Sequence, residues 1–150
     1  MKLLSNFELQ TTLALAGVAP ASPYATSIAD RTYALPTLNF LGGAFSTALW
    51  SFQQFFEVLR WTPEANDCDD FARIAAGFAQ MLHYLTPNRP PATALAVGEL
   101  WYVKDSGEGH AINVALCGPS PDGVVFYEPQ TRQLVKLTDT ELARVTIVRF

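Results

Sequence analysis

Residues 66–72 read Asn-Asp-Cys-Asp-Asp-Phe-Ala and open a long stretch with helical periodicity. Asn66 and Asp67 are both good N-cap residues, and apolar residues at three- and four-residue spacing follow as far as Leu85. Cys68 is therefore expected in the first turn of a helix. Unpaired N–H groups and the helix dipole at that end favour an anion, so they favour a thiolate over a thiol.

The rest of the chain divides into a helical, partly irregular first part and a strand-rich second part. Helical signals cover residues 5–17, where Ser5 and Glu8 have capping-box spacing, and residues 44–60. Alternating apolar patterns separated by Gly- and Pro-rich turns then predict strands at residues 94–104, 110–117, 124–128, 133–136 and 145–150. This order predicts an α+β class with helices packed on an antiparallel sheet.

The composition narrows the function classes. The 150 residues are 49% hydrophobic with a formal net charge of −4, so we expect one domain over residues 1–150, made of parts 1–60 and 61–150. The lack of basic character disfavours nucleic acid and anionic membranes as partners. Polar residues interrupt the apolar N-terminal stretch, so no signal peptide is predicted and a cytoplasmic location is the default expectation. The oligomeric state is not predicted.

A histidine in the strand-rich part can be placed beside an acidic or amide side chain. His110 begins a predicted strand directly after a Gly-rich turn. If Leu116 pairs with Val124 in a hairpin, both Glu128 and Gln130 become cross-strand neighbours of His110 on one face. Either a carboxylate or an amide is then available to orient the imidazole.

Together these residues predict a catalytic constellation. Cys68 is the candidate nucleophile, His110 the base, and the third group holds the imidazole in the required tautomer. Cys117, at a strand end before Gly-Pro, is interpreted as a small buried apolar residue. The three tryptophans, of which Trp61 precedes Cys68 by seven residues, are interpreted mainly as core residues.

The carboxylates around Cys68 oppose this chemistry. Nearby negative charge raises the pKa of a thiol, and the helix dipole offsets only about 1 kcal/mol of that effect. Either these side chains form ion pairs, such as Asp69 with Arg73, or a bound cation neutralises them. An oxygen-rich Asp69/Asp70 pair suits Ca²⁺ or Mn²⁺ better than Zn²⁺.

Three motifs carry a family resemblance. Cys-Asp-Asp-Phe-Ala at residues 68–72, Gly-His-Ala at 109–111 and Tyr-Glu-Pro-Gln at 127–130 resemble the papain-like/transglutaminase-like superfamily of cysteine proteases. The block is most similar to the papain-like protease domain of fungal agglutinins, and the resemblance covers about residues 61–131. Glu128 stands where transglutaminase-like domains have Asp, and no lectin module accompanies the block.

The resemblance implies a papain-like fold with the catalytic Cys at a helix N-terminus. It also implies Cys68 as nucleophile, His110 as base, Glu128 as orienting acid, and Asp69 and Asp70 as ligands of Ca²⁺ or Mn²⁺, with no organic cofactor. The predicted function is that of a cysteine peptidase or amidase, an enzyme that acts on a peptide or protein substrate.

Three other functions stay open at this point, and one of them is a cation-binding structural domain in which Asp67, Asp69 and Asp70 act and Cys68 is incidental. The chain is alternatively a catalytically inactive papain-fold module for binding or structure, such as a phage accessory protein. It is also compatible with a transglutaminase-type acyl transferase, because the same triad chemistry serves both hydrolysis and acyl transfer.

Overall fold

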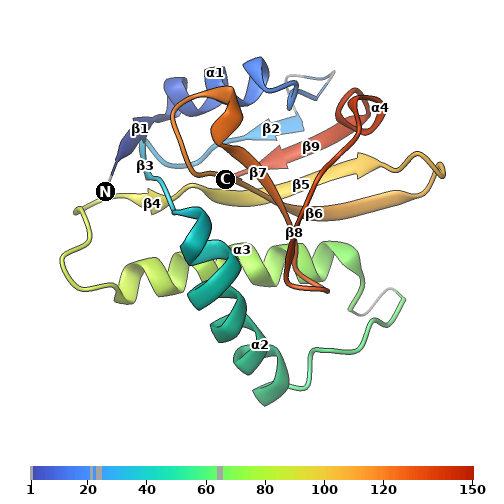
Figure 1. Ribbon diagram of the computed structural model, residues 1–150, viewed down its shortest axis with the longest axis horizontal. Coiled ribbons are helices and arrows are strands. Elements are labelled where there is room, and N and C mark those ends of the chain that lie inside the picture. The colour runs from blue at the N-terminus through green and yellow to red at the C-terminus, as the bar shows by residue number, and fades with distance from the viewer. Residues whose placement is uncertain (1, 21, 23–24, 64–65) are drawn as a thin grey trace.

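The computed structural model describes residues 2–20, 22, 25–63 and 66–150 (Figure 1). The described helical segments are α1 (Asn6–Leu15), the π-helical η2 (Phe40–Phe45), α2 (Ser46–Phe55), α3 (Cys68–Leu85), the 3-10 turn η3 (Pro121–Gly123) and α4 (Asp139–Leu142). The described strands are β1 (Leu3–Ser5), β2 (Thr26–Ser27), β3 (Thr32–Ala34), β4 (Ala94–Leu95), β5 (Val97–Val103), β6 (Gly109–Leu116), β7 (Val124–Glu128), β8 (Gln133–Val135) and β9 (Val145–Arg149).

The strands form two sheets. The smaller sheet has the order β1-β3-β4, and the larger has the order β2-β9-β5-β6-β7-β8. Each sheet contains one parallel pair, β3 with β4 in the smaller and β2 with β9 in the larger, while the other pairs are antiparallel. The first sixty residues therefore add strands to both sheets.

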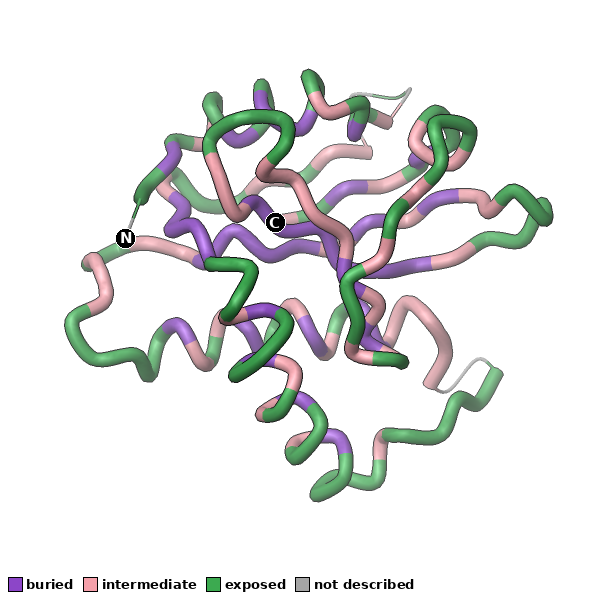
Figure 2. Tube along the Cα trace, in the orientation of Figure 1, coloured by how far each residue is buried: buried purple, intermediate pink, exposed green. Residues whose placement is uncertain are grey.

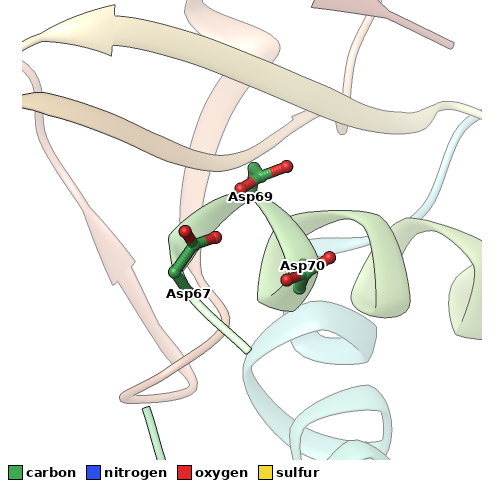
Figure 3. A group of neighbouring side chains, drawn as sticks. All are labelled: Asp67, Asp69 and Asp70. Atoms are coloured by element: carbon green, nitrogen blue, oxygen red, sulfur yellow. The ribbon is translucent and has the colours of Figure 1, made fainter. Parts of the chain in front are cut away.

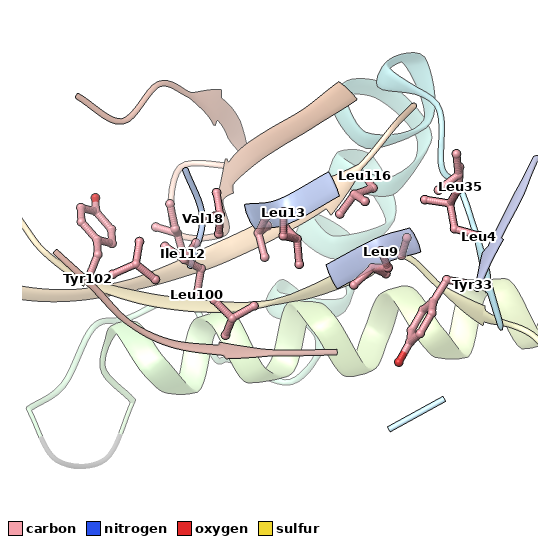
Figure 4. Packing of buried hydrophobic residues seen from close by; sticks show 14 residues of the cluster. Leu4, Leu9, Leu13, Val18, Tyr33, Leu35, Leu100, Tyr102, Ile112 and Leu116 are labelled. Carbon is pink, nitrogen blue, oxygen red and sulfur yellow. The ribbon is translucent and has the colours of Figure 1, made fainter. Parts of the chain in front are cut away.

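The larger sheet has an apolar cluster on each face, and the central strands are the most buried part of the trace (Figure 2). On one face, Leu9 and Leu13 of α1 pack with Leu100, Ile112 and Leu116 (Figure 4). The other face is covered by α3, which lies below β5 and β6 in Figure 1 and packs its small and aromatic residues against Val97, Ala115 and Tyr127. The apolar part of β6 thus lies between α1 on one face and α3 on the other.

Many local predictions are confirmed. The strand over residues 124–128 is present as predicted, the helix with Cys68 in its first turn is α3, and Ser5 and Glu8 form the expected capping box on α1. None of the described helices is long and apolar enough to cross a lipid bilayer.

The predicted fold class is wrong. We predicted a papain-like fold with helices packed on one antiparallel sheet. The structure instead has two sheets, and each of them contains a parallel pair of strands. The prediction failed because β1, β2 and β3 are only two or three residues long, which is too short to carry a two-residue alternation. Such strands depend on their tertiary partners, β9 and β4, which are distant in the sequence.

Candidate functional site

Cys68 occupies the position that the sequence predicts, at the first residue of α3. Asp67 is the N-cap residue with extended backbone angles, and its carbonyl accepts a hydrogen bond from the Phe71 N–H. Cys68 itself is half-buried, and Ala72 and Ala75 behind it are fully buried. The thiol therefore lies at the border between the core and the surface.

His110 and Glu128 are brought together by the β6–β7 pairing. Leu116 pairs with Val124, as the sequence predicts, and Glu128 then ends β7 beside the start of β6. His110 Nε2 and Glu128 Oε2 are 2.7 Å apart, and these side chains are only 10% and 13% exposed. The carboxylate, rather than the Gln130 amide, is thus the partner of the imidazole.

Tyr102 is a member of this site that the sequence reasoning missed. Its ring meets the His110 ring edge-on with centroids 5.8 Å apart, and the two residues are register partners in β5 and β6. Burial, followed by the negative charges of Glu141, Glu128 and Cys68, raises the pKa of Tyr102 to about 12. The charges of Cys68 and Glu128 therefore both act on this phenol. The hairpin turn at residues 105–109 was the signal that would have paired Tyr102 with His110.

The structure joins two of the three residues of the predicted triad. His110 and Glu128 form a hydrogen-bonded pair. Within the described residues, no hydrogen bond connects the Cys68 thiol to His110. The assignment of Cys68, His110 and Glu128 to a functional site stays a prediction.

Three carboxylates lie at the first turn of α3, where Figure 3 shows them. Asp67, Asp69 and Asp70 each offer an oxygen, and these oxygens lie within 4.8 Å of one another. Arg73 pairs with Asp69 at 3.0 Å, as predicted, and with Asp70 at 3.1 Å. Asp67 Oδ1 is buried and has no hydrogen-bond partner among the described residues.

The pKa values of two of these carboxylates are shifted in opposite directions. Hydrogen bonding to Asp69, then burial and the charges of Asp69 and Asp70, raise the pKa of Asp67. Hydrogen bonding from Asp67, together with the Arg73 guanidinium, lowers the pKa of Asp69. Asp67 is therefore the carboxylate that holds a proton most readily, and a bound cation would displace that proton.

The turn between β7 and β8 carries a second group of polar and aromatic residues. Arg132 places its guanidinium carbon 4.3 Å from the centre of the Trp50 ring and donates to the Gln130 carbonyl at 3.1 Å. Its backbone has φ of 60°, and its N–H donates to the Glu128 carbonyl at 2.7 Å. Trp50 is 37% exposed, so it is not the core residue that was expected.

The same turn is held from below by α2. Gln53 is fully buried, and its Nε2 donates to the Pro129 carbonyl at 3.4 Å while its Oε1 lies 3.4 Å from Arg132. Glu128 Oε1 accepts the Gln130 N–H at 3.0 Å. One continuous set of contacts therefore runs from Trp50 through the turn to His110.

Comparison with known proteins gives a fold. No protein-family model matches the sequence, and no curated protein matches it. Among the solved structures that match, two do so over 99% of this chain. The PSL1a-E64 complex has a TM-score of 0.70 and 23% identity. Polyporus squamosus lectin, bound to the human-type influenza-binding epitope Neu5Aca2-6Galb1-4GlcNAc, has a TM-score of 0.69 and 19% identity.

The chain shares the fold of this lectin. It spans about half the length of each matching structure, 51% and 49% respectively. The predicted organisation as one domain over residues 1–150 is not tested by this match and stays a prediction.

The comparisons correct the predicted family and function. The matching structures are those of a lectin, so the recognition of a papain-like/transglutaminase-like cysteine protease is wrong. The predictions of a cysteine peptidase, amidase or acyl transferase, of an enzyme, and of a peptide substrate are corrected with it. The physical reason is that the three motifs are short and lie within about half of the chain. Local motifs of this kind do not determine a function, because one fold supports many functions.

Proposed function

We propose that this chain is a carbohydrate-binding protein without hydrolase activity. The observation that carries the proposal is the fold shared with Polyporus squamosus lectin, one structure of which holds the sialylated epitope Neu5Aca2-6Galb1-4GlcNAc. The proposed site is the turn between β7 and β8 together with Trp50 of α2, which we call the Trp50–Arg132 site. It consists of Trp50, Gln53, Gln130 and Arg132.

The side chains of this site suit an acidic sugar. An exposed indole offers an apolar face on which the C–H groups of a sugar ring pack, and its N–H is available to a hydroxyl. The Arg132 guanidinium offers planar donors that match a carboxylate such as that of Neu5Ac. Because the chain has a formal net charge of −4, an anionic sugar needs such a local positive charge.

The turn is held rigidly before any ligand arrives. Glu128 fixes Gln130 through its N–H, Gln53 holds the Pro129 carbonyl, and His110 locks the Glu128 carboxylate. A preorganised turn loses less conformational entropy on binding, which strengthens affinity. In this proposal His110 and Glu128 are positioning residues.

Isothermal titration calorimetry with the trisaccharide Neu5Aca2-6Galb1-4GlcNAc tests this function. We expect saturable binding that weakens at least about tenfold in Arg132→Ala, because a desolvated charge-assisted pair is lost. Arg31→Ala removes the same charge at an exposed position and serves as the matched control. Equal weakening in both variants, or no binding by the unaltered chain, would refute the proposal.

We further propose that Ca²⁺ or Mn²⁺ binds at the first turn of α3, held by Asp67, Asp69 and Asp70. The donor set fits, because it consists of carboxylate oxygens within 4.8 Å of one another and includes the buried, unpartnered Asp67 Oδ1. A cation there would satisfy that oxygen and offset the mutual repulsion of the three carboxylates.

Calorimetric titration with CaCl₂ and with MnCl₂ tests the cation site. Asp67→Asn is expected to weaken binding at least about tenfold, since one of three anionic ligands becomes neutral. Asp122→Asn, at an exposed position in η3, is the control with the same change of charge. Absence of heat with either salt, at millimolar concentration, would exclude the site.

A further inference from the structure

A cavity of about 480 Å³ lies at the opposite end of α3 from Cys68. His83, in the last turn of α3, lines it, and fifteen residues separate His83 from Cys68. At 1.5 Å per residue this separation corresponds to about 22 Å along the helix. The cavity shares no lining residue with the Trp50–Arg132 site, and its volume lies in the range of small-molecule pockets.

The wall of the cavity is mainly apolar. Hydrocarbon surface comes from Leu35 and Pro36 in the segment after β3, from Phe40 of η2 and from Leu95 of β4. Cys117, which follows β6, adds its sulfur, and burial raises the pKa of this thiol to about 11. At neutral pH Cys117 is therefore an uncharged, polarisable group that packs like a small apolar side chain.

The polar side chains of the wall already have partners within the protein. Thr37 Oγ1 accepts the Phe40 N–H at 3.1 Å, and Thr86 Oγ1 donates to the Leu82 carbonyl at 2.9 Å. His83 is buried, and its Nε2 lies 3.1 Å from the Thr93 hydroxyl. Burial is the main cause of the lowered pKa of His83, so this imidazole is neutral at pH 7. The interior thus favours an apolar ligand body.

Lys2 differs from the other lining residues because it carries a charge. It is exposed and the one lining residue with a permanent positive charge, and no Asp or Glu is among the described lining residues. Its side chain makes no hydrogen bond or salt bridge within the described residues. Its backbone is fixed, because the Lys2 carbonyl accepts the Leu35 N–H at 3.0 Å. Lys2 is therefore anchored at the cavity through its backbone, and its ammonium group is available to an anion.

We propose that this cavity binds a single-chain amphiphile with a carboxylate head, of the fatty-acid class. The hydrocarbon chain fills the space between η2 and the end of α3, and the carboxylate pairs with the Lys2 ammonium. The proposal goes beyond carbohydrate binding and does not rest on it, because the two sites share no residue.

Isothermal titration calorimetry with octanoate, decanoate and dodecanoate, each below its micellar concentration, tests the proposal. We expect one saturable site whose affinity rises about fourfold for each added methylene group. Lys2→Glu is expected to weaken dodecanoate binding about tenfold, because attraction becomes repulsion, and to leave the binding of uncharged dodecanol within about twofold.

Two controls keep the outcome decisive. Lys136→Glu changes the charge identically at an exposed position outside the cavity, so it is expected to leave dodecanoate binding unchanged. In a Cys68→Ser background, dodecanoate is expected to slow the alkylation of Cys117 by N-ethylmaleimide, because Cys117 lines the same space. No saturable binding, equal loss in both lysine variants, or alkylation unaffected by ligand would overturn the proposal.

Discussion

Asn113 ties the beginning of α3 to the larger sheet, and its replacement tests this attachment. The side chain is fully buried in β6, and its Nδ2 donates to the carbonyls of Ala72 in α3 at 2.8 Å and of Gly98 in β5 at 3.0 Å. Its Oδ1 is buried without a partner among the described residues. One amide thus bridges three elements close to the candidate site.

The cost of Asn113→Ala follows from these contacts. Each lost hydrogen bond is worth about 1 kcal/mol, and the truncated side chain leaves a small cavity that adds to the loss. Removing the unpartnered Oδ1 recovers about 1 kcal/mol of desolvation cost. The expected net decrease in the free energy of unfolding is about 2 kcal/mol, which lowers the melting temperature by about 4–8 °C.

Asn113→Asp gives the same site a pH dependence. Burial and two facing carbonyl oxygens raise the pKa of the introduced carboxyl group above its unfolded value of about 3.9. The protonated form is therefore favoured in the folded state. Stability relative to the unaltered chain is expected to be highest below about pH 4 and to decrease as the pH rises through the folded-state pKa.

Urea denaturation followed by circular dichroism, at pH values from 3 to 8, measures both effects. Asn39→Ala is the matched control, because Asn39 is exposed and its side chain caps no helix. If Asn113→Ala is as stable as the Asn39→Ala control, or if Asn113→Asp shows no pH dependence beyond that of the unaltered chain, the bridging role is refuted.

Three further perturbations have definite expected outcomes. In Gly98→Ala an added Cβ would clash with the Arg149 carbonyl oxygen, so chemical denaturation is expected to show a decrease in the free energy of unfolding of about 3 kcal/mol or more. Because the pKa of Tyr102 is raised to about 12, the folded state stabilises the neutral phenol, and that stability is complete below about pH 10. The free energy of unfolding of the unaltered chain is therefore expected to decrease as the pH rises from 10 to 12. In Tyr102→Phe this decrease, measured by alkaline denaturation, is expected to be smaller by about 2 to 3 kcal/mol. Ser5→Ala removes the cap of α1 and is expected to lower the unfolding free energy by about 1 kcal/mol in a thermal melt, whereas an unchanged midpoint would contradict the observed capping box.

The sequence contained enough information for most elements of the second half of the chain. Period-two alternation and turn residues predicted β6 and β7 and the pairing of Leu116 with Val124, and this register brought His110 to Glu128. The class of the fold was not predictable in the same way. It depends on the pairing of β2 with β9 and of β3 with β4, which are long-range contacts of strands too short to show a pattern.

The candidate site was predicted only where neighbours follow from strand register or helical spacing. Trp50 has helical spacing that is equally compatible with a core position, and its contact with Arg132 depends on a left-handed backbone conformation at Arg132. Nothing in the local sequence requires that conformation, because the residue is neither Gly nor Asn. The motifs around Cys68 could be recognised in the sequence, but they did not determine the function.

The most direct measurement of the central claim is a chemical-shift titration of the ¹⁵N-labelled chain with Neu5Aca2-6Galb1-4GlcNAc. The account predicts saturable shifts at the Trp50 indole N–H and at the backbone amides of Gln130 and Arg132, with few changes around α1. Absence of shifts at saturating sugar, or shifts confined to another face of the molecule, would contradict carbohydrate binding at the Trp50–Arg132 site.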